Sequence, residues 1–246
     1  YCLSILAVVT SLMGLKYRLT GAELSSVIRG RDWASIRLDA RQLARAEQIT
    51  RKWLTTVAEL QRRGGWRLKY KAPWNQATEK TVIKTDQGLT IIDNRKPYST
   101  AFTAMQFVYA WETFGEQFYL DVALRTASLY LQAQDKQGWW MHTILVNQDG
   151  QSIVPEEKRM SWHKWTAIIQ DHVQTGVITL MVYLHRVTGK KSFLEAARRG
   201  VDLLVRAQNP NGSWSHHWNA IDRRGDSDKG SPHGGEINDG ATTQSM

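Results

Sequence analysis

Apolar residues recur along much of this chain at the three- and four-residue spacing of amphipathic helices. The pattern predicts a helical region over residues 20–60 and four well-defined helices, over residues 99–113, 117–133, 173–187 and 192–207. The polar stretches between the helices are predicted to be irregular. One of them holds two short apolar segments around an Asp-Gln-Gly sequence, which predicts a small hairpin of residues 81–83 with residues 89–92.

The helical pattern repeats with a period of 74 residues. Residues 101–140 align with residues 175–214, and 11 of the 40 aligned positions are identical, including Tyr109 with Tyr183. Each copy has two helical runs joined at a Gly and ends in Gln-x-x-x-Gly-x-Trp, and a weaker copy ends at Trp66. A fixed period of this kind is typical of repeat architectures. The sequence therefore predicts an all-α fold, an incomplete (α/α) toroid of repeated helical hairpins with its long loops on one rim.

The composition is that of a globular protein with a basic surface. Apolar residues make up 42% of the chain and charged residues 22%, which excludes global disorder. The formal net charge is +9, and a positive surface attracts polyanions such as acidic polysaccharides; a basic surface that only faces water is the alternative. The cationic residues are scattered, so no nucleic-acid-binding tail is indicated. The single cysteine, Cys2, excludes an internal disulfide and a cysteine-based metal site.

The first residues have the character of an export signal. Residues 3–15 are almost wholly apolar but form a short run for a membrane span, and the sequence turns polar directly afterwards. We expect residues 1–16 to be an export segment, with a buried helix as the alternative, and residues 17–246 to form the toroid, truncated at its C-terminal end. The protein would then be secreted or periplasmic, without stable membrane insertion after processing.

Tryptophan is concentrated near the ends of the predicted helices. Of the 11 tryptophans, eight lie at these ends or in the loops that follow. The Gly and Trp of each Gln-x-x-x-Gly-x-Trp ending are expected to serve the structure, because Gly permits a left-handed turn and Trp packs over the next hairpin. Trp162, Trp165 and Trp218 lie within loops, where a flat ring with a polar edge suits stacking on a sugar; packing under the loops is the alternative.

Two acidic residues, Asp171 and Asp239, lie where a loop enters a helix in successive repeats. Ordinary helix capping is the simplest interpretation. Carboxylate oxygens at the same height on neighbouring repeats are also ligands that calcium prefers, so the pair is a candidate calcium site. His216, His217 and His233 give only a weak transition-metal pattern, since they lack helical spacing. Nucleophile-elbow, phosphate-loop and dinucleotide motifs are absent from the sequence.

The chain resembles the pectate lyases of polysaccharide lyase family ten at three places: the segment Ala207-Gln-Asn-Pro-Asn-Gly-Ser-Trp214, the Thr188-Gly189 pair before it, and Asn238-Asp-Gly-Ala241 after it. The resemblance covers residues 170–246 well and the earlier repeat loosely. It implies a toroidal helical fold and cleavage of pectate, a uronic-acid polysaccharide, by calcium-assisted β-elimination. The acidic polysaccharide would be the partner of a monomeric enzyme.

The resemblance also implies roles for individual residues. Asp239 would hold calcium near the substrate carboxylate, with Asn238 beside it as a substrate contact. Asp171 would occupy the family's acidic position in the cleft and share the metal. His172 stands where the family has an asparagine and would contact the substrate.

The proton-abstracting arginine of the family is expected beyond residue 246, and Arg223 and Arg224 are the loop arginines nearest Asp239 in the sequence. Two other functions therefore remain open. A carbohydrate-binding toroid without catalysis would lack a base in the cleft. A toroidal glycoside hydrolase would place two carboxylates, such as Asp171 and Asp239, on either side of the bond.

Overall fold

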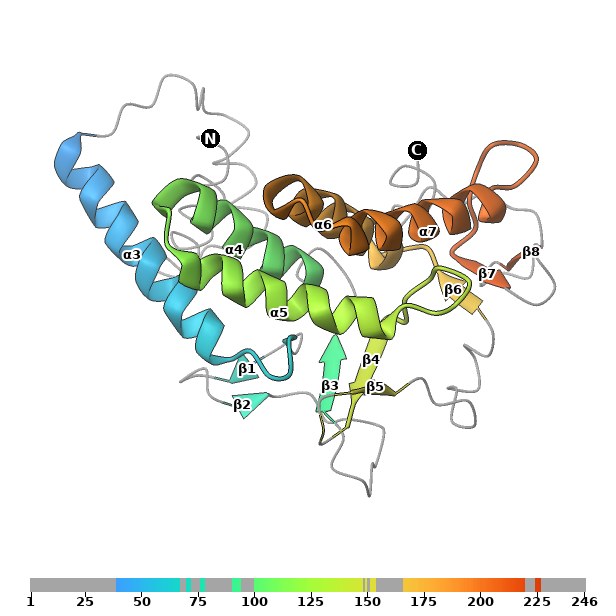
Figure 1. Cartoon of the computed structure of the whole chain (residues 1–246), viewed down its shortest axis with the longest axis horizontal. Coiled ribbons are helices and arrows are strands. Elements are labelled where there is room, and N and C mark those ends of the chain that lie inside the picture. Colours follow the sequence, from blue (N-terminus) through green and yellow to red (C-terminus); the bar gives the residue numbers. More distant parts are fainter. Residues whose placement is uncertain are drawn as a thin grey trace. The chain divides into compact units, whose positions relative to one another are not determined.

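The structure is a computed structural model of the 246-residue chain (Figure 1). It describes residues 39–66, 70–71, 76–77, 90–93, 100–147, 149, 151–153, 166–219 and 224–226. The chain divides into two compact units, Tyr1–Glu59 and Leu60–Met246, and each is considered by itself.

In the first unit the described residues form one helix, α3 (Ala40–Glu59). Its start is fixed by a reciprocal cap, in which the Gln42 amide donates to Asp39 Oδ1 at 2.7 Å and the Asp39 amide donates to Gln42 Oε1 at 2.9 Å. Such a cap satisfies amide groups that have no partner inside the helix. The helical prediction is confirmed for these residues, and its earlier part, residues 20–38, lies outside the described residues.

In the second unit, four described helices form two hairpins (Figure 1). The first pairs α4 (Thr100–Phe114) with α5 (Gln117–Ala133), and the second pairs α6 (Val173–Thr188) with α7 (Lys191–Ala207). Gly115 and Gly189 make the hairpin turns with φ of 73° and 71°, values that only glycine adopts readily. Every one of these helices begins and ends within one residue of its predicted bounds.

The two hairpins pack against each other through α4 and α6, which carry few charged residues. Phe107 and Val108 of α4 and Leu180, Met181 and Leu184 of α6 are 0% exposed. Burial of each large apolar side chain stabilises the fold by roughly 1.5–3 kcal/mol relative to exposure. An apolar interface between α4 and α6 therefore joins one hairpin to the next.

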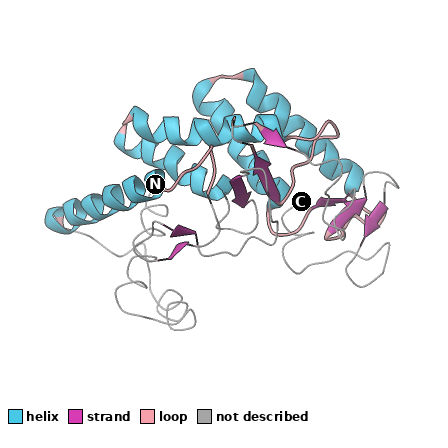
Figure 2. Cartoon of the chain, turned by 90° about the horizontal axis from the view of Figure 1, so that it is seen from below, coloured by secondary structure: helices cyan, strands magenta, loops and turns pink. Residues whose placement is uncertain are grey.

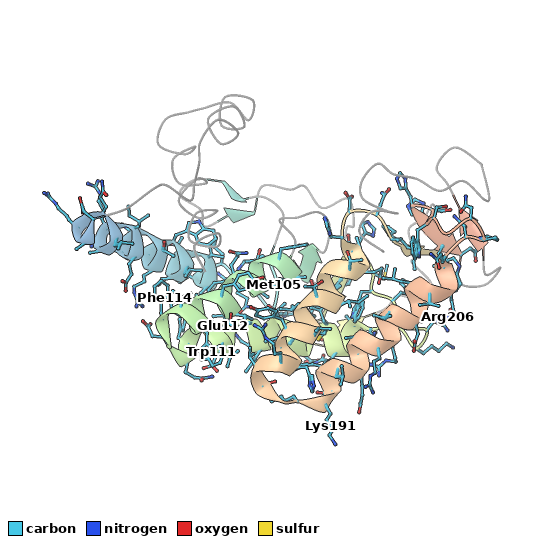
Figure 3. All side chains as sticks on the ribbon, turned by 90° about the horizontal axis from the view of Figure 1, so that it is seen from above. Met105, Trp111, Glu112, Phe114, Lys191 and Arg206 are labelled. Carbon is cyan, nitrogen blue, oxygen red and sulfur yellow. The ribbon has the colours of Figure 1, made fainter. Side chains whose placement is uncertain are left out.

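Equivalent positions of the two repeats meet across this interface. Tyr109 and Tyr183 contact edge to face, with ring centroids 5.3 Å apart. Arg186 donates to Glu112 at 2.9 Å, and Tyr183 donates to the other carboxylate oxygen at 3.0 Å. Figure 3 labels Glu112 near the C-terminal end of α4. The 74-residue period of the sequence is thus a structural period as well.

Short antiparallel sheets occupy the connections that the sequence predicted to be irregular (Figure 2). The first repeat has β3 (Thr90–Asp93), β4 (Thr143–Val146) and β5 (Ser152–Ile153), in that spatial order. The second repeat has the same arrangement of β6 (Thr166–Ile168), β7 (His217–Asn219) and β8 (Arg224–Asp226). A separate two-stranded sheet pairs β1 (Tyr70–Lys71) with β2 (Gln76–Ala77).

The all-α prediction is therefore correct for the helices and wrong for these connections. Of the predicted small hairpin, residues 90–92 belong to β3 but pair with β4, so that Ile91 is opposite Leu145; residues 81–83 lie outside the described residues. Strand β3 precedes α4 and pairs with β4, which follows α5. In the same way, β6 precedes α6 and pairs with β7, which follows α7. Local periodicity does not reveal such a pairing, because folding of the intervening hairpin brings the two strands together.

The helices among the described residues are all too short or too polar to cross a membrane. The predicted export segment, residues 1–16, lies outside the described residues.

Candidate functional site

Each copy of the repeat ends in the same tight turn. The Gly138 amide donates to the Asp135 carbonyl, and the Gly212 amide donates to the Asn209 carbonyl, each at 2.8 Å. The φ angles of Gly138 and Gly212 are 100° and 84°, so the turn requires glycine in both copies.

The tryptophan that closes each turn is an anchor. Trp140 Nε1 donates to the Tyr130 carbonyl at 2.9 Å, and Trp214 Nε1 donates to the Leu204 carbonyl at 2.8 Å. The two indoles are 0% and 5% exposed. A buried indole N–H needs such a partner, and here each one reaches back to its own helix. The structural role expected for these tryptophans is confirmed.

A hydrogen-bonded clamp joins the turn after α5 to α7. Gln134 Nε2 donates to the Ala196 carbonyl at 2.9 Å, and Gln134 Oε1 accepts from Arg199 Nε at 3.0 Å. The same amide also donates to the Gly138 carbonyl at 3.0 Å. One side chain therefore holds its own turn and the neighbouring repeat together.

The same clamp occurs one repeat earlier. Gln61 Nε2 donates to the Val122 carbonyl at 3.0 Å, and Gln61 Oε1 accepts from Arg125 Nε at 2.8 Å. We call these two sets, Gln61 with Arg125 and Gln134 with Arg199, the inter-repeat clamp. It fixes the height at which successive repeats present their sheets and turns.

A second set of hydrogen bonds fastens the start of α6. Gln174 is 0% exposed, and its Oε1 accepts from the Trp140 amide at 3.0 Å. Its Nε2 donates to the carbonyls of Trp140 and Ile168, at 2.9 and 2.8 Å. Thr100 holds Trp66 in a related way at the start of α4. Because Ile168 ends β6, Gln174 fixes both ends of the short connection from β6 to α6.

That connection contains two consecutive residues in the left-handed backbone conformation. Asp171 has a φ of 60° and His172 a φ of 58°. Each such non-glycine residue costs roughly 1–3 kcal/mol and persists only where the surrounding structure fixes it. Strain of this kind is concentrated at functional sites, and it lies here at the acidic residue that the sequence singled out. The prediction that Asp171 is the N-cap residue of α6 is wrong. The N-cap residue is His172, and the His172 side chain makes no capping hydrogen bond.

The His172 ring lies against the first hairpin. It contacts Phe102 of α4 edge to face, with ring centroids 5.2 Å apart, and its Nδ1 is 3.4 Å from Thr175 Oγ1. Burial lowers the pKa of His172 below its ordinary value of 6.5, and the negative charge of Asp171 opposes this shift. The imidazole is therefore neutral at neutral pH, so it offers hydrogen-bonding atoms rather than a charge.

The side chain before Asp171 supplies a further oxygen. Gln170 Oε1 is buried and accepts no hydrogen bond from the described residues. The backbone here is tied to the neighbouring strand, since the Ile169 amide donates to the His216 carbonyl at 2.7 Å. An amide oxygen and a carboxylate on adjacent residues are the kind of donors that hard cations such as calcium accept. We call Gln170, Asp171 and His172 the strained turn.

The candidate histidines are buried. His216 and His217 are 4% and 8% exposed, and their ring centroids are 6.4 Å apart. His142, at the position equivalent to His216, is also buried, at 5% exposure. Sequence reasoning missed His142, although alignment of the repeats two residues past Trp140 would have found it. In the part of the chain that the structure describes, no group of three or more His, Cys, Asp or Glu residues is placed to hold a metal ion.

Trp218 packs in the core instead of lining a sugar site. It is 3% exposed and belongs to a buried cluster with Ile169, Leu203 and Trp214. Its ring faces are covered, so the structure supports the packing alternative for this residue. The other candidates lie outside the described residues: Trp162, Trp165, Arg223, His233, Asn238 and Asp239.

Arg224 lies in strand β8 and not in a loop. Its backbone is opposite Asn219 of β7, at one end of the β6-β7-β8 sheet. At the other end, Asp226 is opposite His217, and His217 is opposite Ile168. The chain runs from Ile168 into the strained turn, so the register brings Asp226 nearer to that turn than Arg224. This register gives no support to Arg224 as the proton-abstracting base.

Part of the chain is similar to a known protein family. A family model described as pectic acid lyase matches residues 134–224. Among solved structures, a family 10 polysaccharide lyase from Cellvibrio cellulosa aligns with a TM-score of 0.46 and 16% identity, over 71% of this chain and 56% of the lyase. A mutant of that lyase in complex with trigalacturonic acid aligns with a TM-score of 0.45 and 16% identity, over 71% and 57% of the two chains. No curated protein sequence matches the chain.

The chain spans a little over half the length of these two solved lyases. The residues matched by the family model run from the end of α5 into β8. They include the inter-repeat clamp at Gln134, the strained turn, the second hairpin and the segment from Ala207 to Trp214 on which the resemblance rested. The pectic acid lyase model thus matches the chain over residues 134–224, which is less than half of its 246 residues.

Proposed function

We propose that the protein is a lyase that cleaves a uronic-acid polysaccharide, pectate, by metal-assisted β-elimination. The family match carries the proposal, because the matched residues include the strained turn. The formal net charge of +9 also suits a polyanionic substrate. We further propose that the helical hairpins belong to an (α/α) toroid and that the protein is monomeric and secreted or periplasmic.

The proposed reaction removes a weakly acidic proton from the carbon next to the uronate carboxylate. A base takes this proton, an enolate-like anion develops, and the glycosidic oxygen then leaves. A bound calcium ion would supply positive charge at the carboxylate on which the negative charge develops. The residues of the chain must therefore hold oxygen donors at a fixed place and orient the sugar.

The strained turn is suited to this task. Asp171 offers a carboxylate, and Gln170 offers an amide oxygen, Oε1, that accepts no hydrogen bond from the described residues. Both are of the ligand type that calcium prefers. Asp239, predicted to share the ion, lies outside the described residues. His172 is proposed to bind the sugar by hydrogen bonds as a neutral imidazole. Because Gln174 fixes the connection, the backbone of these groups is ordered before the substrate arrives.

The test is the ultraviolet absorbance of the unsaturated product during incubation with polygalacturonate. Absorbance should rise with calcium present and stop rising when a chelator is added. Asp171→Asn should lower the rate by roughly a hundredfold or more, because it removes charge from the metal site. Asp202→Asn is the matched control, since Asp202 is an exposed carboxylate of α7, and it should leave the rate unchanged.

Other outcomes distinguish the alternatives. Tryptophan fluorescence that responds to polygalacturonate, without any unsaturated product, would support a carbohydrate-binding protein. New reducing ends without a rise in absorbance would support a glycoside hydrolase. If neither binding nor cleavage of any uronate polymer occurs, the lyase proposal is wrong for this protein.

A further inference from the structure

The interface between α4 and α6 brings equivalent positions of the two repeats together, and one of these pairs lies beside the strained turn. Tyr109 and Tyr183, one period of 74 residues apart, contact each other through two large rings. Phe102 and Gly176 are also one period apart and also lie together. Here a phenyl ring meets a residue that has no side chain, so the ring can approach the backbone of α6 closely.

Gly176 provides the space for that ring. A Cβ atom on Gly176 would lie 3.0 Å from Phe102 Cε2 and 3.5 Å from Phe102 Cδ2, and 3.7 Å from His172 Cβ. The glycine lies within α6, where it is less favourable than alanine because it loses more conformational freedom on folding. Helix formation alone therefore does not account for glycine at this position, and the close approach of Phe102 does.

The same phenyl ring supports His172. The two rings meet edge to face, with an interplanar angle of 82° and centroids 5.2 Å apart. Aromatic pairs of this geometry attract each other by more than their buried area accounts for. On the side of α6, Thr175 Oγ1 is 3.4 Å from His172 Nδ1. Contacts from two different helices therefore orient the imidazole.

Both rings are attached to anchored segments of backbone. Phe102 lies two residues after Thr100, whose hydroxyl bonds to the backbone of Trp66. His172 lies two residues before Gln174, whose side chain makes three buried hydrogen bonds. A binding group is held precisely when the residues that support it are themselves fixed. The positive φ of His172 also persists only where contacts outweigh its cost, and the contact with Phe102 is one of them.

We propose that Phe102 is a positioning residue of the strained turn: it holds the His172 ring in the orientation in which that ring binds the sugar, and Gly176 gives it the room to do so. Phe102 acts through His172 and needs no contact of its own with the polysaccharide. The inference rests on the proposed function, because it takes His172 as a group that binds a uronic-acid polysaccharide.

The first test compares Phe102→Leu with the parent protein. Leucine keeps the apolar bulk but lacks the flat ring. The dissociation constant for polygalacturonate, followed by tryptophan fluorescence, and the KM of the lyase reaction should rise by roughly three- to tenfold. The kcat should stay within about twofold, because His172 binds the sugar and takes no part in the proton transfer. Phe118→Leu is the matched control, since Phe118 is exposed on α5 and contacts Tyr119, and it should change neither constant.

A double-mutant cycle shows whether Phe102 acts through His172. In a His172→Ala background, Phe102→Leu should have no further effect on binding, whereas two independent contributions would multiply. Gly176→Ala covers the case in which Phe102→Leu does not fold. Alanine suits the helix, but its methyl group must displace the Phe102 ring, so binding should weaken by roughly threefold in the parent and stay unchanged in the His172→Ala background.

The NMR signals of the His172 ring protons give a readout that is independent of the polysaccharide. They are assigned by their absence from the His172→Ala variant. They should shift in Phe102→Leu, because the magnetic field of the neighbouring phenyl ring is removed, and they should not shift in Phe118→Leu.

Two results would overturn the inference and leave the lyase proposal in place. One is an unshifted His172 signal in Phe102→Leu, and the other is a loss of binding from Phe102→Leu that is as large in the His172→Ala background as in the parent. A parent protein that neither binds nor cleaves polygalacturonate would overturn the proposed function, and the inference with it.

Discussion

The two helical hairpins have the same plan, but among the described residues only the first has a following hairpin packed against it. Trp140 and Trp214 make the same bond back to their own helices, because both partners of that bond lie within one repeat. Gln134 and Gln208 differ, because the clamp needs an arginine from the following repeat. Identical residues therefore contribute differently to stability according to whether their partner belongs to the same repeat or to the next one.

The largest expected difference is between the two turn glycines. Gly138→Ala should lower the free energy of unfolding by about 3–5 kcal/mol, since it adds a clash with the Arg199 carbonyl to the cost of a positive φ. Gly212→Ala has only the conformational cost and should lower it by about 1–2 kcal/mol. Urea unfolding of both variants measures the difference. Equal losses would mean that α7 does not touch Gly138.

The two residues that fasten the helix starts give the next comparison. Gln174→Leu removes three buried hydrogen bonds and should lower the free energy of unfolding by about 3 kcal/mol. Thr100→Val removes two longer ones and should lower it by about 1 kcal/mol. Thermal unfolding followed by circular dichroism provides the measurement. A larger loss for Thr100→Val would show that Gln174 does not hold the β6 to α6 connection.

The strained turn should separate stability from activity. Asp171→Gly removes the penalty of a left-handed non-glycine residue and should raise the free energy of unfolding by about 1 kcal/mol. The same variant should lose lyase activity, because it lacks the carboxylate. Asp171→Asn is the control, since asparagine tolerates this conformation: it should leave stability nearly unchanged and still lose activity. Loss of stability in Asp171→Gly would contradict the strain.

The smallest effect is expected at the interface between α4 and α6. Burial raises the pKa of Tyr183 above 10.0, and the hydrogen bond to Glu112 adds to the shift. The folded protein therefore favours the neutral phenol. Its contribution to stability is present below pH 10.0 and is lost as the pH rises through the folded-state pKa. Tyr183→Phe should make the free energy of unfolding less sensitive to pH above this value, as urea titrations at about pH 8 and about pH 11 would show. An unchanged dependence on pH in the Tyr183→Phe variant would contradict this prediction.

The sequence by itself determined the helices, their hairpin turns and the repeat. Each helix is a local structure whose apolar period can be read within a few turns, and Gly115 and Gly189 mark the breaks because only glycine readily adopts a positive φ. The motif from Gln208 to Trp214 was sufficient to indicate the resemblance, and the pectic acid lyase model matches a region that includes this motif. Asp171 was singled out because its residue type and its place before a helix are both visible in the sequence.

Only the tertiary structure decided the pairing of β3 with β4, the burial of Trp218 and the strain at Asp171 and His172. Each of these depends on contacts between segments that are distant in the sequence. A strand needs a partner strand, a tryptophan is buried only if something covers it, and a left-handed residue persists only when the surrounding contacts outweigh its cost. The clamp depends in the same way on Arg199 reaching Gln134 from the next repeat, and therefore the sequence alone showed the glutamine without showing its partner.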